Sequence, residues 1–266
     1  MNIFDALTTA GARQASTAWA RTAGWAMEER PVAGAHKIVV TGSASVFVCR
    51  GQQARMLVAT ESPDDLVRIH TDIVGSKLVI DQEPTVIYGK ATVSSVRGSA
   101  TQFFQNVVIH GGVAARDIIH TYGDRRGDST TVESSSGSNI VHGAGRTMVA
   151  IVAPDIEAIS IKGSAEVFLF DLDQDELSLD VKGSASIEAA GRVQQLEVDV
   201  SGSGNIDARE LVAQHADVSV SGSGHVRARA AEAVRARVSG SGRVRIWGNP
   251  PKRDHKVSGV GDVRFE

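Results

Sequence analysis

From residue 151 onward, valine-rich runs alternate apolar and polar residues, and a short Gly-Ser or Gly-Val step separates one run from the next. The glycines of these steps recur at spacings of 20, 19, 20, 18 and 19 residues: Gly163, Gly183, Gly202, Gly222, Gly240 and Gly259. A constant short period is typical of solenoid proteins, in which one structural unit is stacked on copies of itself. The second half of the chain is therefore predicted to be a repeat array.

Counting in steps of two from each glycine, the same kinds of residue recur in every repeat. The position two before the glycine is always Val or Ile, the position two after is Ala or Gly, and the position four after is Val or Ile. Successive residues of a strand point to opposite faces, so these positions share one buried side. The pattern predicts an all-β fold, a single-chain parallel β-helix with about 19–20 residues per coil. Antiparallel sheets of hairpins fit less well, because hairpins would not keep the same residue types in columns.

The glycine of each step falls between two β-rich runs, where a coil has to turn a corner. Glycine permits both the bend and a close approach to the next coil. We therefore predict that Gly42 and the six glycines named above are structural corner residues. The serines beside them form an outward ladder that includes Ser201 and Ser221, and contacts between hydroxyl groups explain it better than nucleophiles, since no base accompanies them. No catalytic residues are expected.

The whole chain divides into four predicted parts. Residues 1–30 have apolar residues at helical spacing and charges that sum to zero, which favours an amphipathic helix docked on the protein, as a cap, over a membrane-surface helix. Residues 31–81 are predicted to form the first coils, because 38–48 alternates in the register of the repeats. Residues 82–150 form an irregular insertion of strands and loops, and residues 151–266 form the regular stack.

Composition excludes several classes of function. A net charge of −3 and a pI near 6.2 argue against a nucleic-acid-binding protein. Because Cys49 is the only cysteine, the chain has no internal disulfide framework and no cysteine-based zinc site. Cys49 could form a disulfide with a second chain, but an unreactive cysteine without a functional role is favoured. No segment is long and apolar enough to span a membrane. The N-terminus lacks the basic and apolar regions of a signal peptide, so a cytoplasmic location is expected.

No cofactor and no metal site are expected. The acidic turn at residues 171–176 offers carboxylates for Ca²⁺, but it lacks the glycine and the glutamate that an EF-hand loop has at its sixth and twelfth positions. A solvated turn is therefore favoured. The eight histidines show no spacing typical of metal ligands.

Charge is distributed unevenly along the stack. Residues 151–211 carry 13 acidic and 4 basic side chains, a net charge of −9, whereas residues 212–266 carry 5 acidic and 10 basic ones, a net charge of +5. One outward column ends in three arginines: Arg227, Arg245 and Arg264. Two interpretations stay open for them. Their side chains either lie along the surface, with Asp207 paired to Arg227, or bind an acidic partner or an anionic glycan.

Two segments carry a resemblance to a known family. Residues 28–61 read EERPVAGAHKIVVTGSASVFVCRGQQARMLVATE, and residues 147–169 read TMVAIVAPDIEAISIKGSAEVFL and are followed by the SGSG ladder. They resemble the opening and the second half of the head GIN domains, a bacterial family named after autotransporter adhesins and without an established activity. The resemblance covers residues 28–266 and implies a single-chain parallel β-helix. It also implies export or lipid anchoring, which the N-terminal sequence does not support.

The sequence thus predicts a non-catalytic β-solenoid scaffold or adhesin-like module. We expect it to bind a protein or a cell surface through its outer face or its open C-terminal end, where a second copy could also associate end to end. The alternative is a carbohydrate-binding or carbohydrate-cleaving β-helix. A groove with three or more carboxylates or aromatic rings would favour that alternative, whereas a flat face of Ser, Arg and Lys would favour the scaffold.

Overall fold

The computed structural model describes residues 22–32, 34–82 and 146–266. It also gives the backbone of six short strands: β7 (Thr85–Tyr88), β8 (Ser94–Ser95), β9 (Val107–His110), β10 (Ile119–His120), β11 (Thr131–Val132) and β12 (Val141–His142). Most of the predicted insertion therefore lies outside the described residues. Residues 1–21 of the predicted N-terminal helix also lie outside the described residues, whereas residues 22–25 form a turn and residues 26–30 form a strand.

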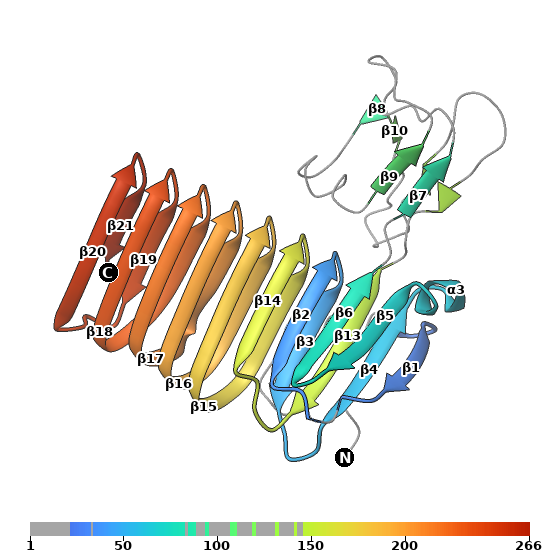
Figure 1. Cartoon of the computed structure of the whole chain (residues 1–266), viewed down its shortest axis with the longest axis horizontal. Helices are drawn as coiled ribbons and strands as arrows, with labels where there is room; N and C mark the ends of the chain where they lie inside the picture. Colours follow the sequence, from blue (N-terminus) through green and yellow to red (C-terminus); the bar gives the residue numbers. More distant parts are fainter. Residues whose placement is uncertain are drawn as a thin grey trace.

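The regular part of the chain is a parallel β-solenoid of about 5 turns (Figure 1). Its strands are β14 (Ala158–Gly163), β15 (Glu166–Gly183), β16 (Ser186–Gly202), β17 (Asn205–Gly222), β18 (His225–Gly240), β19 (Arg243–Trp247), β20 (Lys252–Gly259) and β21 (Asp262–Phe265). Each pairs in parallel with the strand one coil away, so that Val181 lies opposite Val200 and Val200 opposite Val220. The all-β solenoid predicted from the repeat is confirmed.

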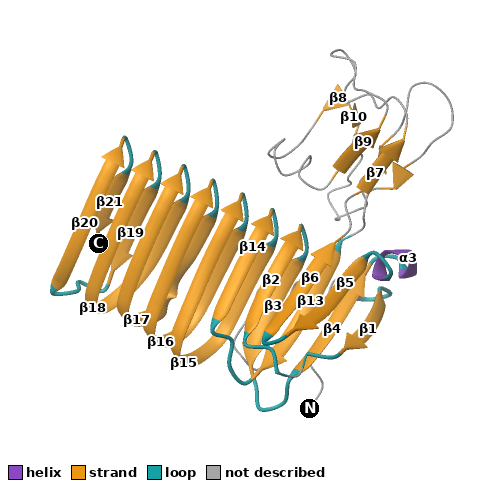
Figure 2. Ribbon diagram, in the orientation of Figure 1, coloured by secondary structure: helices purple, strands orange, loops and turns teal. Residues whose placement is uncertain are grey.

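Each long strand turns a corner and contributes to two faces of the solenoid (Figure 2). What we call the β20 face runs through β5 (Ile69–Val74), β6 (Lys77–Gln82), β2 (Lys37–Gly42), β14, the second halves of β15 to β18, and β20. The β21 face runs through β1 (Ala26–Arg30), β4 (Arg55–Thr60), β13 (Thr147–Ala153), β3 (Ser45–Arg50), the first halves of β15 to β18, β19 and β21.

The core lies between the two faces and consists of columns of aliphatic side chains. In one column, Leu179, Val198, Val218 and Ala236 follow one another on successive strands, and all four are 0% exposed. Full burial of one aliphatic side chain stabilises the folded state by about 1.5–3 kcal/mol. The repeated columns therefore stabilise the stack and also fix its register, because a shift by one residue would expose every member of a column.

Residues 37–50 form a coil of the same stack, although a long segment separates them from it in sequence. Gly42 lies opposite Gly163, and Val46 lies opposite Val167. β13 pairs with the other edge of β3, away from β15, whereas β14 lies between β2 and β15. The turn at residues 154–157, which joins β13 to β14, therefore crosses this first coil from one side to the other.

The N-terminal end differs from the predicted series of coils. Of the strands in residues 31–81, only β2, β3 and β6 run parallel to the stack, whereas β4 and β5 are antiparallel to their neighbours. A tight turn at Gly75, with φ 62°, reverses the chain between β5 and β6. Antiparallel strands need only such short turns, so they can end a parallel stack.

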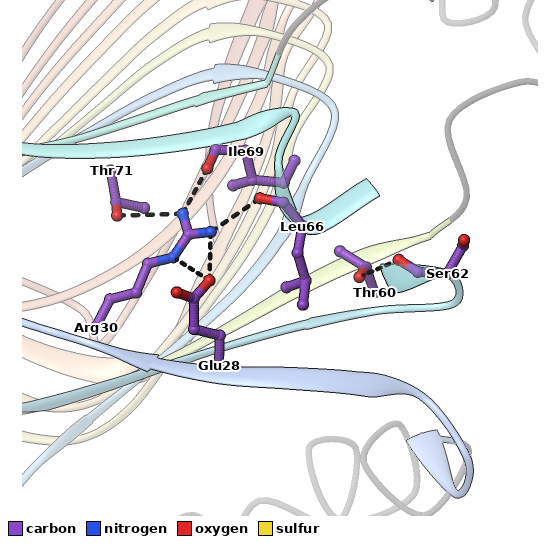
Figure 3. A network of polar contacts seen from close by, with 7 residues as sticks. All are labelled: Glu28, Arg30, Thr60, Ser62, Leu66, Ile69 and Thr71. Atoms are coloured by element: carbon purple, nitrogen blue, oxygen red, sulfur yellow. Dashed lines mark hydrogen bonds and ion pairs between the residues drawn. The ribbon is translucent and has the colours of Figure 1, made fainter. Parts of the chain in front are cut away.

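A partly buried arginine holds this end together (Figure 3). Arg30 of β1 is 14% exposed and forms an ion pair of 2.7 Å with Glu28. Its guanidinium donates hydrogen bonds to the carbonyl oxygens of Leu66 and Ile69 and to the hydroxyl of Thr71. Leu66 ends the short helix α3 (Pro63–Leu66), and the other two acceptors belong to β5, so one side chain joins three elements.

Candidate functional site

The three arginines of the predicted outward column lie on consecutive strands of the β21 face. Arg227 of β18 pairs in register with Arg245 of β19, and Arg245 pairs with Arg264 of β21. Neighbouring strands are about 4.8 Å apart, so the three side chains emerge one above another. The structure thus places all three on one outer surface.

Two more arginines flank this column. Arg229 follows Arg227 by two residues and Arg243 precedes Arg245 by two, so both point to the same side of the sheet and both are exposed. We call this set the arginine face: Arg227, Arg229, Arg243, Arg245 and Arg264.

Acidic side chains neutralise only part of the arginine face. Arg227 lies 3.5 Å from Asp207, which is the pair that the first interpretation requires, and Arg264 lies 2.6 Å from Asp262. Three members form no ion pair within the described residues: Arg229, Arg243 and Arg245. Their positive charges are exposed and available to an anion in solution.

Asp207 marks the point where the outward column changes from acidic to basic. Burial raises the pKa of Asp207, but hydrogen bonds from Arg209 and the charges of Arg209 and Arg227 outweigh it and lower the pKa. The Arg209 guanidinium is 2.7 Å from this carboxylate and also lies over the ring of Trp247, 5.9 Å from its centroid. The carboxylate is thus ionised at neutral pH and bound to two arginines.

The corner glycines line one edge of the solenoid between the two faces. All seven have φ between 104° and 132°, a backbone conformation that residues with a Cβ rarely adopt. On the six later ones, a Cβ would lie 2.5–2.7 Å from the carbonyl oxygen of the preceding corner glycine. The serine ladder is exposed beside them: Ser201, Ser221, Ser239 and Ser258. This edge is packed backbone against backbone, and it leaves no room for a Cβ on the six later glycines unless the neighbouring coil shifts.

A hollow of about 480 Å³ lies at the opposite edge, between the crossing turn 154–157 and the acidic turn 171–176. We call it the acidic hollow, because five carboxylates line it: Asp155, Glu157, Asp173, Asp175 and Glu176. Arg50 is the only cation among the lining residues, and it lies 3.0 Å from Asp173. Gln174 donates to the carbonyl oxygen of Ile156 at 2.8 Å and so connects the two turns.

His36 joins two carboxylates of the acidic hollow. It immediately precedes β2, and its carbonyl oxygen accepts a hydrogen bond of 2.8 Å from the amide of Glu157. Nδ1 of His36 is 4.0 Å from Oδ2 of Asp155. One potential ligand atom from each of His36, Asp155 and Glu157 lies within 4.8 Å of the other two. Such a set of one imidazole and two carboxylates can hold a divalent cation.

The sequence pattern points to the 171–176 turn but not to His36. To find His36 from the sequence, the first coil has to be paired with the regular stack. His36 and Glu157 each precede a corner glycine by six residues, Gly42 and Gly163 respectively. Aligning those two glycines would have placed the two side chains on neighbouring strands.

A second hollow of about 430 Å³ lies at the same edge, nearer the C-terminus. Its charges compensate one another. Arg235 lies 3.4 Å from Asp217 and 3.5 Å from Asp254, and His215 lies 3.6 Å from Glu232 beside it. This hollow therefore offers less net charge to a partner than the acidic hollow does.

Cys49 points outward from β3 into a second, smaller apolar cluster. It is 1% exposed and shares that cluster with Phe47, whose ring stacks on Phe168 at a centroid distance of 4.9 Å. Burial raises the pKa of the Cys49 thiol to about 11, and the negative charge of Asp171 adds to the effect. The thiol is protonated at neutral pH and shielded, so a disulfide between chains is disfavoured.

Comparison with known proteins gives a family and a fold. Residues 36–250 match the family described as "Putative auto-transporter adhesin, head GIN domain". A crystal structure of a "putative adhesin" from Bacteroides fragilis is similar over 91% of this chain and 97% of that one, with 17% identity and a TM-score of 0.54, which supports the solenoid fold. A "putative lipid binding protein" from Parabacteroides distasonis aligns over the same shares, with 13% identity and a TM-score of 0.44. None of the curated proteins matches the chain.

The family match corrects the location expected from the sequence. The cytoplasmic location is wrong, because an auto-transporter adhesin is an exported protein of the cell surface. That prediction rested only on the lack of signal-peptide features at the N-terminus. In the part of the chain that the structure describes, no helix has the length and apolarity needed to cross a membrane.

Proposed function

The chain belongs to the family described as "Putative auto-transporter adhesin, head GIN domain", and from this premise we propose that it is a non-catalytic interaction module whose arginine face binds an anionic glycan. The observation that carries the proposal is the set of exposed arginines on one side of the sheet, of which Arg229, Arg243 and Arg245 form no ion pair among the described residues. Family and fold support the adhesin-like module, and the arginine face supports the choice of ligand.

Guanidinium groups suit this task because each can form two parallel hydrogen bonds with a carboxylate or a sulfate. On the arginine face they are repeated at the spacing of neighbouring strands, about 4.8 Å. An extended polyanion can therefore contact several arginines at once as it runs along the solenoid axis. Each added contact raises the total affinity without requiring a deep pocket.

A glycan is favoured over an acidic protein as the ligand. Stable protein interfaces have a well-packed apolar or aromatic centre inside a polar rim. The arginine face has Trp247 at its margin, half-buried beneath Arg209, but charged side chains at its centre. A charged surface without an apolar centre matches a hydrated, highly charged chain better than a folded protein.

The proposal is tested with two triple variants that remove comparable amounts of positive charge. Arg229→Gln, Arg243→Gln and Arg245→Gln together should weaken binding to heparin and to polygalacturonate at least tenfold. The control combines Arg235→Gln, Arg237→Gln and Lys252→Gln on the β20 face. It should change the affinity for either glycan less than twofold. Binding of the native chain should weaken with salt.

Two results would contradict the proposal. One is an equal loss in both triple variants, which would mean that net charge alone matters. The other is tight binding of polyglutamate with no binding of either glycan, which would identify an acidic protein as the partner.

The acidic hollow favours carbohydrate cleavage as a second candidate function. Glycoside hydrolysis needs an acid and a second carboxylate on either side of the scissile bond, and the hollow provides five carboxylates. It ranks second because no aromatic ring lines the hollow among the described residues, and the side chain of Asp173 is 71% exposed. Release of reducing ends from polysaccharides, abolished by Asp155→Asn with Glu157→Gln, would support it. No release by the native chain would exclude it for the polysaccharides assayed.

A further inference from the structure

Nδ1 of His36 occupies an unusual position for a ring nitrogen. It is shielded from solvent and has no hydrogen-bond partner within the described chain, although the side chain as a whole is 45% exposed. The contact of 4.0 Å with Asp155 is too long for a hydrogen bond. A buried polar atom without a partner requires an explanation, and a bound ion is one of the few available.

We propose that His36, Asp155 and Glu157 bind a divalent transition-metal ion, with zinc as the best match. The three ligand atoms lie within 4.8 Å of one another. Two ligands about 2.1 Å from a tetrahedral ion are about 3.4 Å apart, so the side chains must move inward by about 1 Å. None of the three residues is fully buried, and rotation of the carboxylates can supply this movement.

The chemistry of the ligands selects the ion. Neutral imidazole suits zinc, copper, iron and nickel, whereas calcium and magnesium prefer sites made entirely of oxygen. Two carboxylates balance the charge of a divalent ion. The remaining acids of the hollow, which include Asp175 and Glu176, add a negative potential that attracts cations. Three protein ligands leave the fourth position of a tetrahedral ion open to water or to a group from a partner.

Because of the position of the site, a bound ion would connect two segments of the chain and stabilise the fold. His36 precedes the first coil, whereas Asp155 and Glu157 belong to the turn that crosses that coil. An ion held by all three would fix the turn that carries the chain from β13 across the first coil to β14. Because the folded chain binds the ion better than the unfolded one, zinc should raise the melting temperature.

The test uses the full chain, stripped with chelator and titrated with zinc chloride by calorimetry. We expect one ion per chain, a rise in melting temperature, and visible absorption bands when Co²⁺ replaces zinc. His36→Gln should weaken zinc binding at least tenfold, and Glu157→Gln should weaken it by a similar factor. His215→Gln is the matched control, because His215 lies beside one carboxylate, Glu232, outside the cluster. It should change the affinity less than twofold.

The absence of zinc binding, or the same affinity in His36→Gln and His215→Gln, would overturn the proposal. If the His36 or Glu157 variant fails to fold, the native chain can still be used to test whether His36 binds zinc. Diethyl pyrocarbonate modifies accessible histidines, and zinc should protect His36 while leaving the reaction of His215 unchanged. Equal protection of both histidines, or of neither, would count against the site. The proposal does not depend on the arginine face, so the glycan and zinc experiments can fail separately.

Discussion

The corner glycines show how strongly a single residue can limit this fold. Gly202 has φ 120°, and a Cβ on it would lie 2.6 Å from the carbonyl oxygen of Gly183. Backbone in this region costs a residue with a side chain about 1–3 kcal/mol before any clash is counted. The cost cannot be relieved by rotating a side chain, because the obstructing atom belongs to the backbone of the neighbouring coil.

We therefore expect Gly202→Ala to lower the free energy of unfolding by about 2 kcal/mol or more. Gly204→Ala is the control, since that position has no positive φ and its column holds Ala165 and Ala185 in earlier coils. Its Cβ would lie 2.6 Å from a methyl group of Val181 and 3.3 Å from the carbonyl oxygen of Ala185. The cost of this variant therefore comes from crowding alone and should be smaller than that of Gly202→Ala, which adds backbone strain. Urea unfolding measures both. Equal costs would show that space in the coil, rather than backbone conformation, is limiting.

Cys49 gives a second prediction at the same scale. With a pKa of about 11, the thiolate is about one part in a thousand at pH 8. Because the side chain is also 1% exposed, we expect no reaction of the native chain with a disulfide reagent at pH 8 within an hour. In denaturant, one thiol per chain should react at once. Rapid reaction of the folded chain would show that the smaller apolar cluster opens readily.

Between elements, the ion pair of Asp207 with Arg227 connects β17 with β18. The pKa of Asp207 is lowered in the folded state, so its stabilisation is present above the pKa of the unfolded form, about 3.9, and is lost as pH falls through the folded value. Asp207→Asn should cost less than about 1 kcal/mol at pH 7, because the pair is partly exposed. At any pH below the folded pKa of Asp207, the variant and the native chain should unfold at the same denaturant concentration. A difference that persists there would have to come from packing.

The regular elements could be predicted from sequence because each strand carries its own register signal. In the later coils, an apolar residue stands two before every corner glycine, as Val220 does before Gly222, and parallel pairing follows once the glycines are aligned. The strands in residues 55–81 could be recognised by alternation, and so could their turn near Gly75. The direction in which they pair could not, because alternation identifies a buried face but not the neighbouring strand.

The candidate sites also differ in whether the repeat pattern predicts them. Arg227, Arg245 and Arg264 follow from the repeat itself, because residues at one position of successive coils must lie in one column. The flanking positions Arg229 and Arg243 belong to the same surface and were missed only because they occupy other columns. His36 needed one further step, the alignment of Gly42 with Gly163 across the long segment between them, because only that pairing brings it beside Glu157.

At the scale of the whole molecule, the two ends of the stack differ in the strands that form them. Antiparallel strands end it on the N-terminal side. On the other side, β20 is exposed along its length, and its inward positions hold Arg253 and His255 where the preceding coil has Val234 and Ala236. Arg253 lies over the ring of Phe265, 4.7 Å from its centroid, and His255 meets the same ring edge-on at 5.6 Å. Inward-pointing polar residues are a known device against pairing between exposed edge strands.

This arrangement allows a direct test of end-to-end association, which the sequence predicted and which stays a prediction. Val257 and Val260 on the last coil are 38% and 85% exposed and could contact an apolar surface of a second copy. Arg253 and His255 oppose an apolar contact there. Arg253→Val with His255→Ala restores the pattern of the preceding coil, so we expect it to raise the fraction of dimers and larger species in light scattering, even at high salt. If the double variant and the native chain have the same mass at every protein and salt concentration, the last coil is not an association surface, and the outer faces become the remaining candidates.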